Sequence, residues 1–166
     1  RDTSVTGVQT CALPIWHGMS DKLVAILKKS KLFSRFRQEQ LEEVVAHLQP
    51  RLITLEPGGL VYQRGAPSDR CWLIQSGHLT VRRASLRTPF RTMIYHAGSV
   101  TGIQGLADPG SPRTVTMIAE DEVKLIEITH DGVAKMDKET QILLWENVSR
   151  LLLRKLTACL AKESLD

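Results

Sequence analysis

The chain has 166 residues, of which 42% are hydrophobic and 24% are charged, and its formal net charge is +4. This balance is that of an ordinary folded domain that can bury a core without metals or disulfides. No apolar run approaches the roughly 20 residues that span a bilayer, and the mild positive charge permits an anionic partner without requiring one.

The first residues resemble translated laboratory DNA. Residues 5–15 read VTGVQTCALPI, which matches the translation of a common sequencing-library adapter, and Arg1 and Asp2 fit its upstream part. They do not resemble a signal peptide, because no basic start precedes a long apolar stretch. We therefore expect residues 1–18 to lie outside the fold and the domain to span residues 19–166.

Two helices are predicted within residues 19–50. The first, residues 20–31, begins at a serine that can cap it and carries apolar residues on one face. The second, residues 38–48, has apolar residues at helical spacing and ends before Pro50. Basic residues near this start of the domain, among them Lys31, are expected to form solvated faces.

Residues 51–129 change to short β-type runs separated by turns that contain glycine or proline. Strands are expected at residues 51–55, 60–63, 70–75, 79–83, 90–96, 114–119 and 123–128. About seven or eight short strands at this spacing indicate a β-sandwich, jelly roll or barrel.

A long helix is predicted over residues 131–162. Its apolar stripe contains Leu144, Val148, Leu151 and Leu152. The stripe either packs only on the strands of its own chain or also pairs with a second copy. The fold class is therefore mainly β with flanking helices: a β-roll of the jelly-roll type (a double-stranded β-helix) with N-terminal helices and a long C-terminal helix.

Three segments resemble parts of one known family. Residues 55–65, LEPGGLVYQRG, resemble its first hairpin, and residues 71–81, CWLIQSGHLTV, resemble its next hairpin. Residues 98–106, followed by residues 112–116, resemble its phosphate-binding cassette. The resemblance covers most of residues 33–162 and points to the cyclic nucleotide-binding domain family. It implies an effector domain of the catabolite-activator type without the DNA-binding module.

The cassette residues suit an anion. Gly102 allows close approach of the backbone, residues 103–107 can form a short helix whose free N–H groups face an anion, and Arg113 can donate two hydrogen bonds to a phosphate. From the residues alone, an exposed turn before a strand is the favoured alternative for Arg113. The resemblance implies that Arg113 and Thr114 hold the cyclic phosphate. The expected ligand-binding residues are Thr101, Gly102, Ile103, Gly105, Leu106, Arg113 and Thr114.

Ile103 departs from the family pattern, which has a glutamate that accepts a hydrogen bond from the ribose 2′-hydroxyl. Isoleucine has no acceptor, and a hydrogen bond to a charged group is worth about 1.5–3 kcal/mol. Its loss should weaken binding about ten- to a hundredfold. Thr101, where the family often has an aromatic residue, is a smaller departure. The domain therefore binds a cyclic nucleotide weakly, binds another anion, or has a pocket that no longer binds a ligand.

No residue constellation indicates catalysis. The histidines form no pair at metal or triad spacing, and no Gly-x-Ser-x-Gly elbow is present. Cys11, Cys71 and Cys159 are far apart, so we expect free thiols in a reducing cytoplasm, with Cys71 packed mid-strand. The sequence thus predicts neither an enzyme nor a metal or cofactor.

The expected function is that of a bacterial regulatory domain in signal transduction, which binds cyclic AMP or cyclic GMP and repositions its C-terminal helix. One alternative is an interaction module without nucleotide binding, and another is a truncated transcription regulator that lacks its helix-turn-helix. The expected partners are the nucleotide and a second copy bound through the C-terminal helix, with no DNA bound by this fragment.

The parent protein is a separate expectation. Residues 112–119 and the tail also look similar to the C-terminal regulatory domains of some bacterial sulfate-permease-type transporters and of some glutaminases. A transporter or enzyme domain in the parent protein is therefore a further expected partner. The expected location is the cytoplasm, including the cytoplasmic part of a membrane protein.

Overall fold

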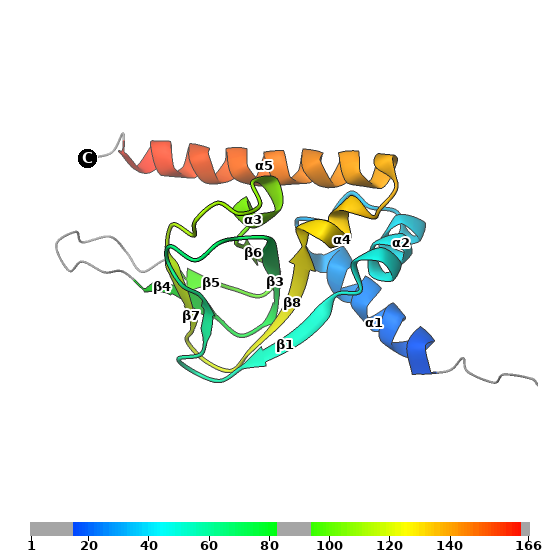
Figure 1. The fold of residues 1–166 in the computed structure, drawn as a ribbon, viewed down its shortest axis with the longest axis horizontal. Coiled ribbons are helices and arrows are strands. Elements are labelled where there is room, and N and C mark those ends of the chain that lie inside the picture. The colour runs from blue at the N-terminus through cyan, green and yellow to red at the C-terminus, as the bar shows by residue number, and fades with distance from the viewer. Residues whose placement is uncertain (1–14, 83–93, 164–166) are drawn as a thin grey trace, which may run out of the picture.

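The computed structural model describes residues 15–82 and 94–163 (Figure 1). Helix α1 spans Ile15–Lys29, so it begins inside the segment that was predicted to lie outside the fold. Helix α2 spans Gln38–Leu48, as predicted, and ends where Gln49 adopts a left-handed conformation with a φ of 40°.

The β-roll consists of two antiparallel four-stranded sheets, with strand orders β1-β8-β3-β6 and β2-β7-β4-β5. The strands are β1 Arg51–Leu55, β2 Leu60–Tyr62, β3 Arg70–Ser76, β4 Leu79–Arg82, β5 Ile94–Tyr95, β6 Val100–Thr101, β7 Thr116–Ala119 and β8 Val123–Thr129. This confirms the predicted jelly-roll class. Strand β6 falls in a stretch for which no strand was predicted, and residues 90–93 of one predicted strand lie outside the described residues.

The predicted long C-terminal helix is confirmed, but it begins at Lys138 rather than at residue 131, because a separate short helix, α4, precedes it. Helix α3 spans Gln104–Ala107, α4 spans His130–Ala134 and α5 spans Lys138–Glu163. Asp137 separates α4 from α5: its carboxylate accepts a hydrogen bond from the Thr140 amide at 2.9 Å, and its own amide donates to Glu43 Oε1 at 2.9 Å. A cap of this kind starts a new helix.

Alternation along β8 divides the core into two clusters. Ile126 and Ile128 face a cluster that the sheet shares with the helices, where Phe33 and Leu144 are also fully buried. Val123, Leu125 and their neighbours face a second cluster inside the roll. Successive strand residues point to opposite faces, so a strand buried on both faces consists largely of apolar residues.

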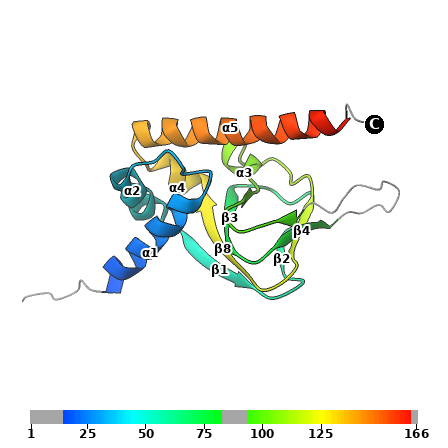
Figure 2. The same ribbon diagram turned by 180° about the vertical axis from the view of Figure 1, so that it is seen from behind.

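The helices cover one end and one side of the roll. Helices α1, α2 and α4 gather at the end where β8 leaves the sheet, and α5 crosses above α3 and α4 and runs along the roll (Figure 1). Figure 2 shows the same layers from behind. The cassette, which includes β6 and α3, thus lies directly beneath α5.

Candidate functional site

Backbone hydrogen bonds to the loop between β2 and β3 fix the backbone of Arg113. Its amide donates to the Ala66 carbonyl, and its carbonyl accepts from the Gly65 amide, both at 2.8 Å. The adjacent Pro112 forms an isolated β-bridge with Pro67. Arg113 is therefore part of a paired segment rather than the exposed turn that the residues alone also allowed.

The guanidinium of Arg113 is buried, with 4% of the residue exposed. Nη1 donates to the Gly102 carbonyl at 3.0 Å, and Nη2 donates to the Arg70 carbonyl at 2.7 Å. Among the described residues, Arg113 makes no ion pair with a carboxylate. Burial lowers the pKa of Arg113 from its usual value, although arginine stays protonated in proteins.

Two aromatic rings pack against this guanidinium. The Arg113 Cζ atom lies 4.7 Å from the ring centroid of Tyr62 and 5.1 Å from that of Trp72, within the range of a cation–π interaction. The two rings stack with their centroids 5.4 Å apart. The Tyr62 hydroxyl hydrogen-bonds the Thr101 hydroxyl at 2.8 Å, and burial raises the pKa of Tyr62. Arg113, Tyr62, Trp72 and Thr101 thus form one contiguous group.

Two glycines allow this packing. Gly102 has a φ of 73°, and a Cβ there would lie 2.8 Å from Arg113 Nη1 and 3.1 Å from the Trp72 ring. A Cβ on Gly105 would lie 2.6 Å from the Arg70 carbonyl oxygen. The sequence predicted a close backbone approach at Gly102, and the structure shows that the neighbour is Arg113 itself.

Ile103 and Leu106 belong to the other side of the cassette. Ile103 is 4% exposed and Leu106 is fully buried, and both pack in the cluster shared with the helices. Trp72, by contrast, belongs to the cluster inside the roll. Ile103 and Leu106 therefore pack in a different cluster from the Trp72 ring that contacts Arg113, although Ile103, Leu106 and Arg113 were all predicted to bind the ligand.

The predicted free N–H groups of residues 103–107 are mostly used within the cassette. The Gly105 amide donates to the Gly102 carbonyl at 3.0 Å, and the Leu106 amide donates to the Ile103 carbonyl at 2.9 Å. Thr114 is exposed. The Arg113 side chain, rather than the N–H groups at the start of α3, is therefore the main candidate to attract an anion at the cassette.

Sequence reasoning missed a second charged group beside Arg113. Arg70 Nη1 lies 3.1 Å from Glu127 Oε1, and Arg70 Nε lies 2.6 Å from Asp69 Oδ1. The Arg70 hydrogen bond lowers the pKa of Asp69. Strand pairing sets Glu127 beside Trp72, and Trp72 beside Thr101 on its other side. The alternation of Arg70 with Trp72 along one strand face was the signal available in the sequence.

Other features carry no chemistry. Cys71 is a free, fully buried thiol, as predicted, and burial raises its pKa to about 12. Where the structure describes side chains, no group of three or more His, Cys, Asp and Glu residues could hold a metal ion. No helix in the described ranges is both long and apolar enough to cross a membrane.

Comparison with known proteins assigns the family. The family model described as cyclic nucleotide-binding domain matches residues 52–139, just over half of the chain. The chain therefore belongs to the cyclic nucleotide-binding domain family, as the resemblance implied. A search of curated protein sequences found no match.

Three solved structures illustrate the similarity. The N-terminal domain of a transcriptional regulator from Streptomyces coelicolor A3(2) is 28% identical with a TM-score of 0.66, over 80% of this chain and 93% of that one. Thermus thermophilus catabolite activator protein is 20% identical with a TM-score of 0.69, and the match covers 82% of this chain and 62% of that one. The regulatory domain of Toxoplasma gondii PKA, solved with cAMP, is 17% identical with a TM-score of 0.64, and the match covers 81% of this chain and 51% of that one.

Proposed function

We propose that this chain is a non-catalytic regulatory domain that binds a cyclic nucleotide in its β-roll, with Arg113 as the phosphate anchor. The observation that supports this most is the buried Arg113 guanidinium, which has no carboxylate partner among the described residues. A buried charge is costly unless it is paired. Two of its five N–H donors bond to carbonyls, so donors remain for a phosphate.

The ribose half of the site lacks its usual acceptor. Ile103 packs in the apolar cluster beneath the helices, so no carboxylate at this position can accept from a ribose hydroxyl. The Tyr62 ring contacts Arg113 and its hydroxyl bonds the Thr101 hydroxyl, so these two hydroxyls offer polar contacts to the ligand. We expect cyclic nucleotide affinity about ten- to a hundredfold weaker than with a carboxylate there.

A titration tests the nucleotide directly. The 166-residue chain is titrated calorimetrically with cyclic AMP and cyclic GMP, and with linear 5′-AMP for comparison. We expect saturable binding of at least one cyclic nucleotide and weaker binding of the linear one. Absence of binding with either cyclic nucleotide up to millimolar concentrations would reject this function and favour the interaction-module alternative.

We propose that α5 transmits the effect of ligand binding to a partner. The inner face of α5 buries Leu144 and Val148 in the helix-side cluster and packs Leu151 against it, so three of the four residues of the predicted stripe pack within the chain. Its outer face exposes a row of leucines, which we propose to be the contact with a second copy: Leu152, Leu153, Leu156 and Leu160. A ligand that binds better when α5 is docked would shift the position of this surface.

The dimer is tested by sedimentation of the full chain. We expect a dimer for the natural sequence and a monomer when Leu153 and Leu156, 63% and 56% exposed, are both changed to lysine. A chain that sediments as a monomer before any substitution contradicts the proposed interface.

We place the domain in the cytoplasm, in line with the free thiol of Cys71.

A further inference from the structure

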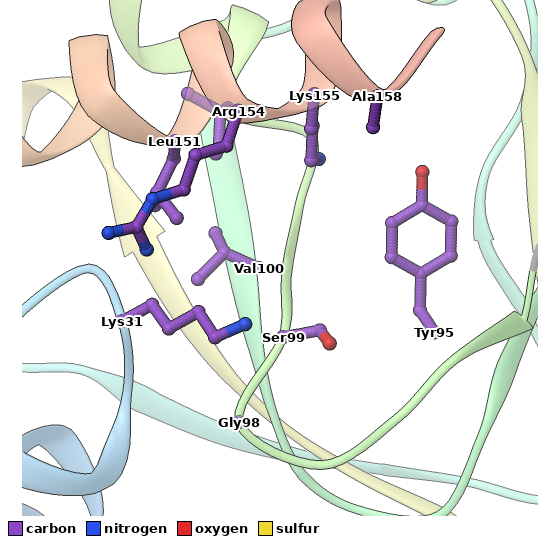
Figure 3. A pocket seen from close by; sticks show the side chains of 10 residues that line it. Lys31, Tyr95, Gly98, Ser99, Val100, Leu151, Arg154, Lys155 and Ala158 are labelled. Carbon is purple, nitrogen blue, oxygen red and sulfur yellow. The ribbon is translucent and has the colours of Figure 1, made fainter. Parts of the chain in front are cut away.

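Three basic side chains gather at a hollow between α5 and the roll, and Arg113 is not among the residues that line it. Lys31 follows α1, whereas Arg154 and Lys155 belong to α5. The hollow has a volume of about 240 Å³. In Figure 3, Arg154 and Lys155 descend from α5 while Lys31 extends toward the same space from below. This basic hollow contains no acidic side chain among its described lining residues.

The cations of the basic hollow have no anionic partner in the part of the chain that the structure describes. None of Lys31, Arg154 and Lys155 forms an ion pair with a described carboxylate. Although much of Lys155 is exposed, its ammonium lies 5.4 Å from the Tyr95 ring centroid, and its partial removal from water lowers its pKa. Like charges that converge without a counter-charge repel one another, and a bound anion relieves that repulsion.

The remaining lining residues limit the size and type of anion. Ser99 contributes a hydroxyl, and Val100, Ile103 and Leu151 contribute apolar surface. A volume of about 240 Å³ is below the roughly 300–1,000 Å³ of pockets for drug-sized ligands. Donors that arrive from several directions suit the tetrahedral oxygens of a phosphoryl group better than the two coplanar oxygens of a carboxylate.

We propose that the basic hollow is a second anion site, which binds a small phosphoryl compound such as inorganic phosphate, pyrophosphate or a small phosphate ester. The bound anion joins Lys31 and the turn at Ser99 to Arg154 and Lys155 on α5. Residues 152–158 of α5 are exposed, so this bridge holds the second half of the helix against the roll. By linkage, such an anion and any ligand that prefers docked α5 strengthen each other's binding. The anion site does not require nucleotide to be bound at Arg113, so it can be tested without nucleotide.

The test uses the full chain with pyrophosphate and inorganic phosphate, against chloride at matched ionic strength. Calorimetry gives the affinity, and hydrogen–deuterium exchange follows the amides of residues 151–158. The test variant carries both Lys31→Ala and Arg154→Ala. Arg150→Ala is the matched control, because Arg150 is on the same helix but pairs with Glu146 outside the hollow. Circular dichroism establishes that each variant is folded, and Lys31→Ala alone serves if the double variant is not.

We expect saturable pyrophosphate binding that slows exchange at residues 151–158. The double variant should weaken it at least about tenfold, Lys31→Ala alone should weaken it less, and Arg150→Ala should leave it unchanged. Absence of saturable binding at millimolar pyrophosphate overturns the site. An equal loss of affinity in Arg150→Ala would overturn the site, because it would show that net charge alone sets the binding. A loss of affinity only in Arg113→Ala would also overturn it, because it would place the anion at the cassette. Tighter binding of citrate than of pyrophosphate overturns the phosphoryl class.

Discussion

The two sides of the cassette differ in chemistry although they are joined at Gly102. On one side, Ile103 and Leu106 pack among apolar residues shared with the helices. On the other side, Arg113 lies against Tyr62 and Trp72, with polar groups around it. The comparison shows that Arg113, the proposed phosphate anchor, lies against two aromatic rings, whereas Ile103, the residue expected at the ribose, is part of the core shared with the helices.

The largest expected effect tests the apolar side. Ile103→Ala should lower the free energy of unfolding by about 2–5 kcal/mol, because it opens a cavity in a buried cluster. It should leave cyclic nucleotide affinity nearly unchanged. Urea unfolding and calorimetric titration measure the two quantities.

Ile142→Ala is the matched control for this substitution. Ile142 is 61% exposed, so its loss should change the free energy of unfolding by no more than about 0.5 kcal/mol. Equal destabilisation by both substitutions, or a large loss of nucleotide affinity in Ile103→Ala, would show that the two sides of the cassette are not separate.

A second test uses Cys71, which is buried among the same apolar residues. Burial raises its pKa in the folded chain to about 12, whereas an unfolded thiol titrates near about 8.5. Between these values the unfolded chain has lost a proton that the folded chain keeps. Stability should therefore fall as pH rises, by about 1.4 kcal/mol per pH unit from this group.

The contribution of Cys71 is isolated by subtraction. The free energy of unfolding is measured across that pH range for the natural chain and for Cys71→Ala, and the two slopes are compared. The natural chain should have the steeper decline. Parallel curves would mean that the folded environment does not resist ionisation of Cys71.

The smallest expected effect tests the polar side. Tyr62→Phe removes the hydroxyl that bonds Thr101 but retains the ring against Arg113, so it should cost about 0.5–1.5 kcal/mol in the free energy of unfolding. The same substitution in a Thr101→Val background should cost less, because the bond is already lost. An unchanged cost in both backgrounds would argue against coupling of the two hydroxyls.

The fold was predictable because its signals are local. Glycine corners, short β-type runs and the cassette follow one another in the sequence, and they identify the roll and the position of Arg113. The break between α4 and α5 was missed because it depends on the contact of Asp137 with Glu43, a residue far away in the sequence. The packing of Tyr62 and Trp72 on Arg113 was missed for the same reason, since three separate segments bring these side chains together.

The central claim is that Arg113 anchors an anionic ligand in the roll. The most direct measurement is a calorimetric titration of cyclic AMP and cyclic GMP into the natural chain, Arg113→Ala and the exposed control Arg82→Ala. Removal of a buried charged donor should weaken binding by at least about thirtyfold, and the control should bind like the natural chain. Equal affinity in Arg113→Ala and the natural chain would contradict the account.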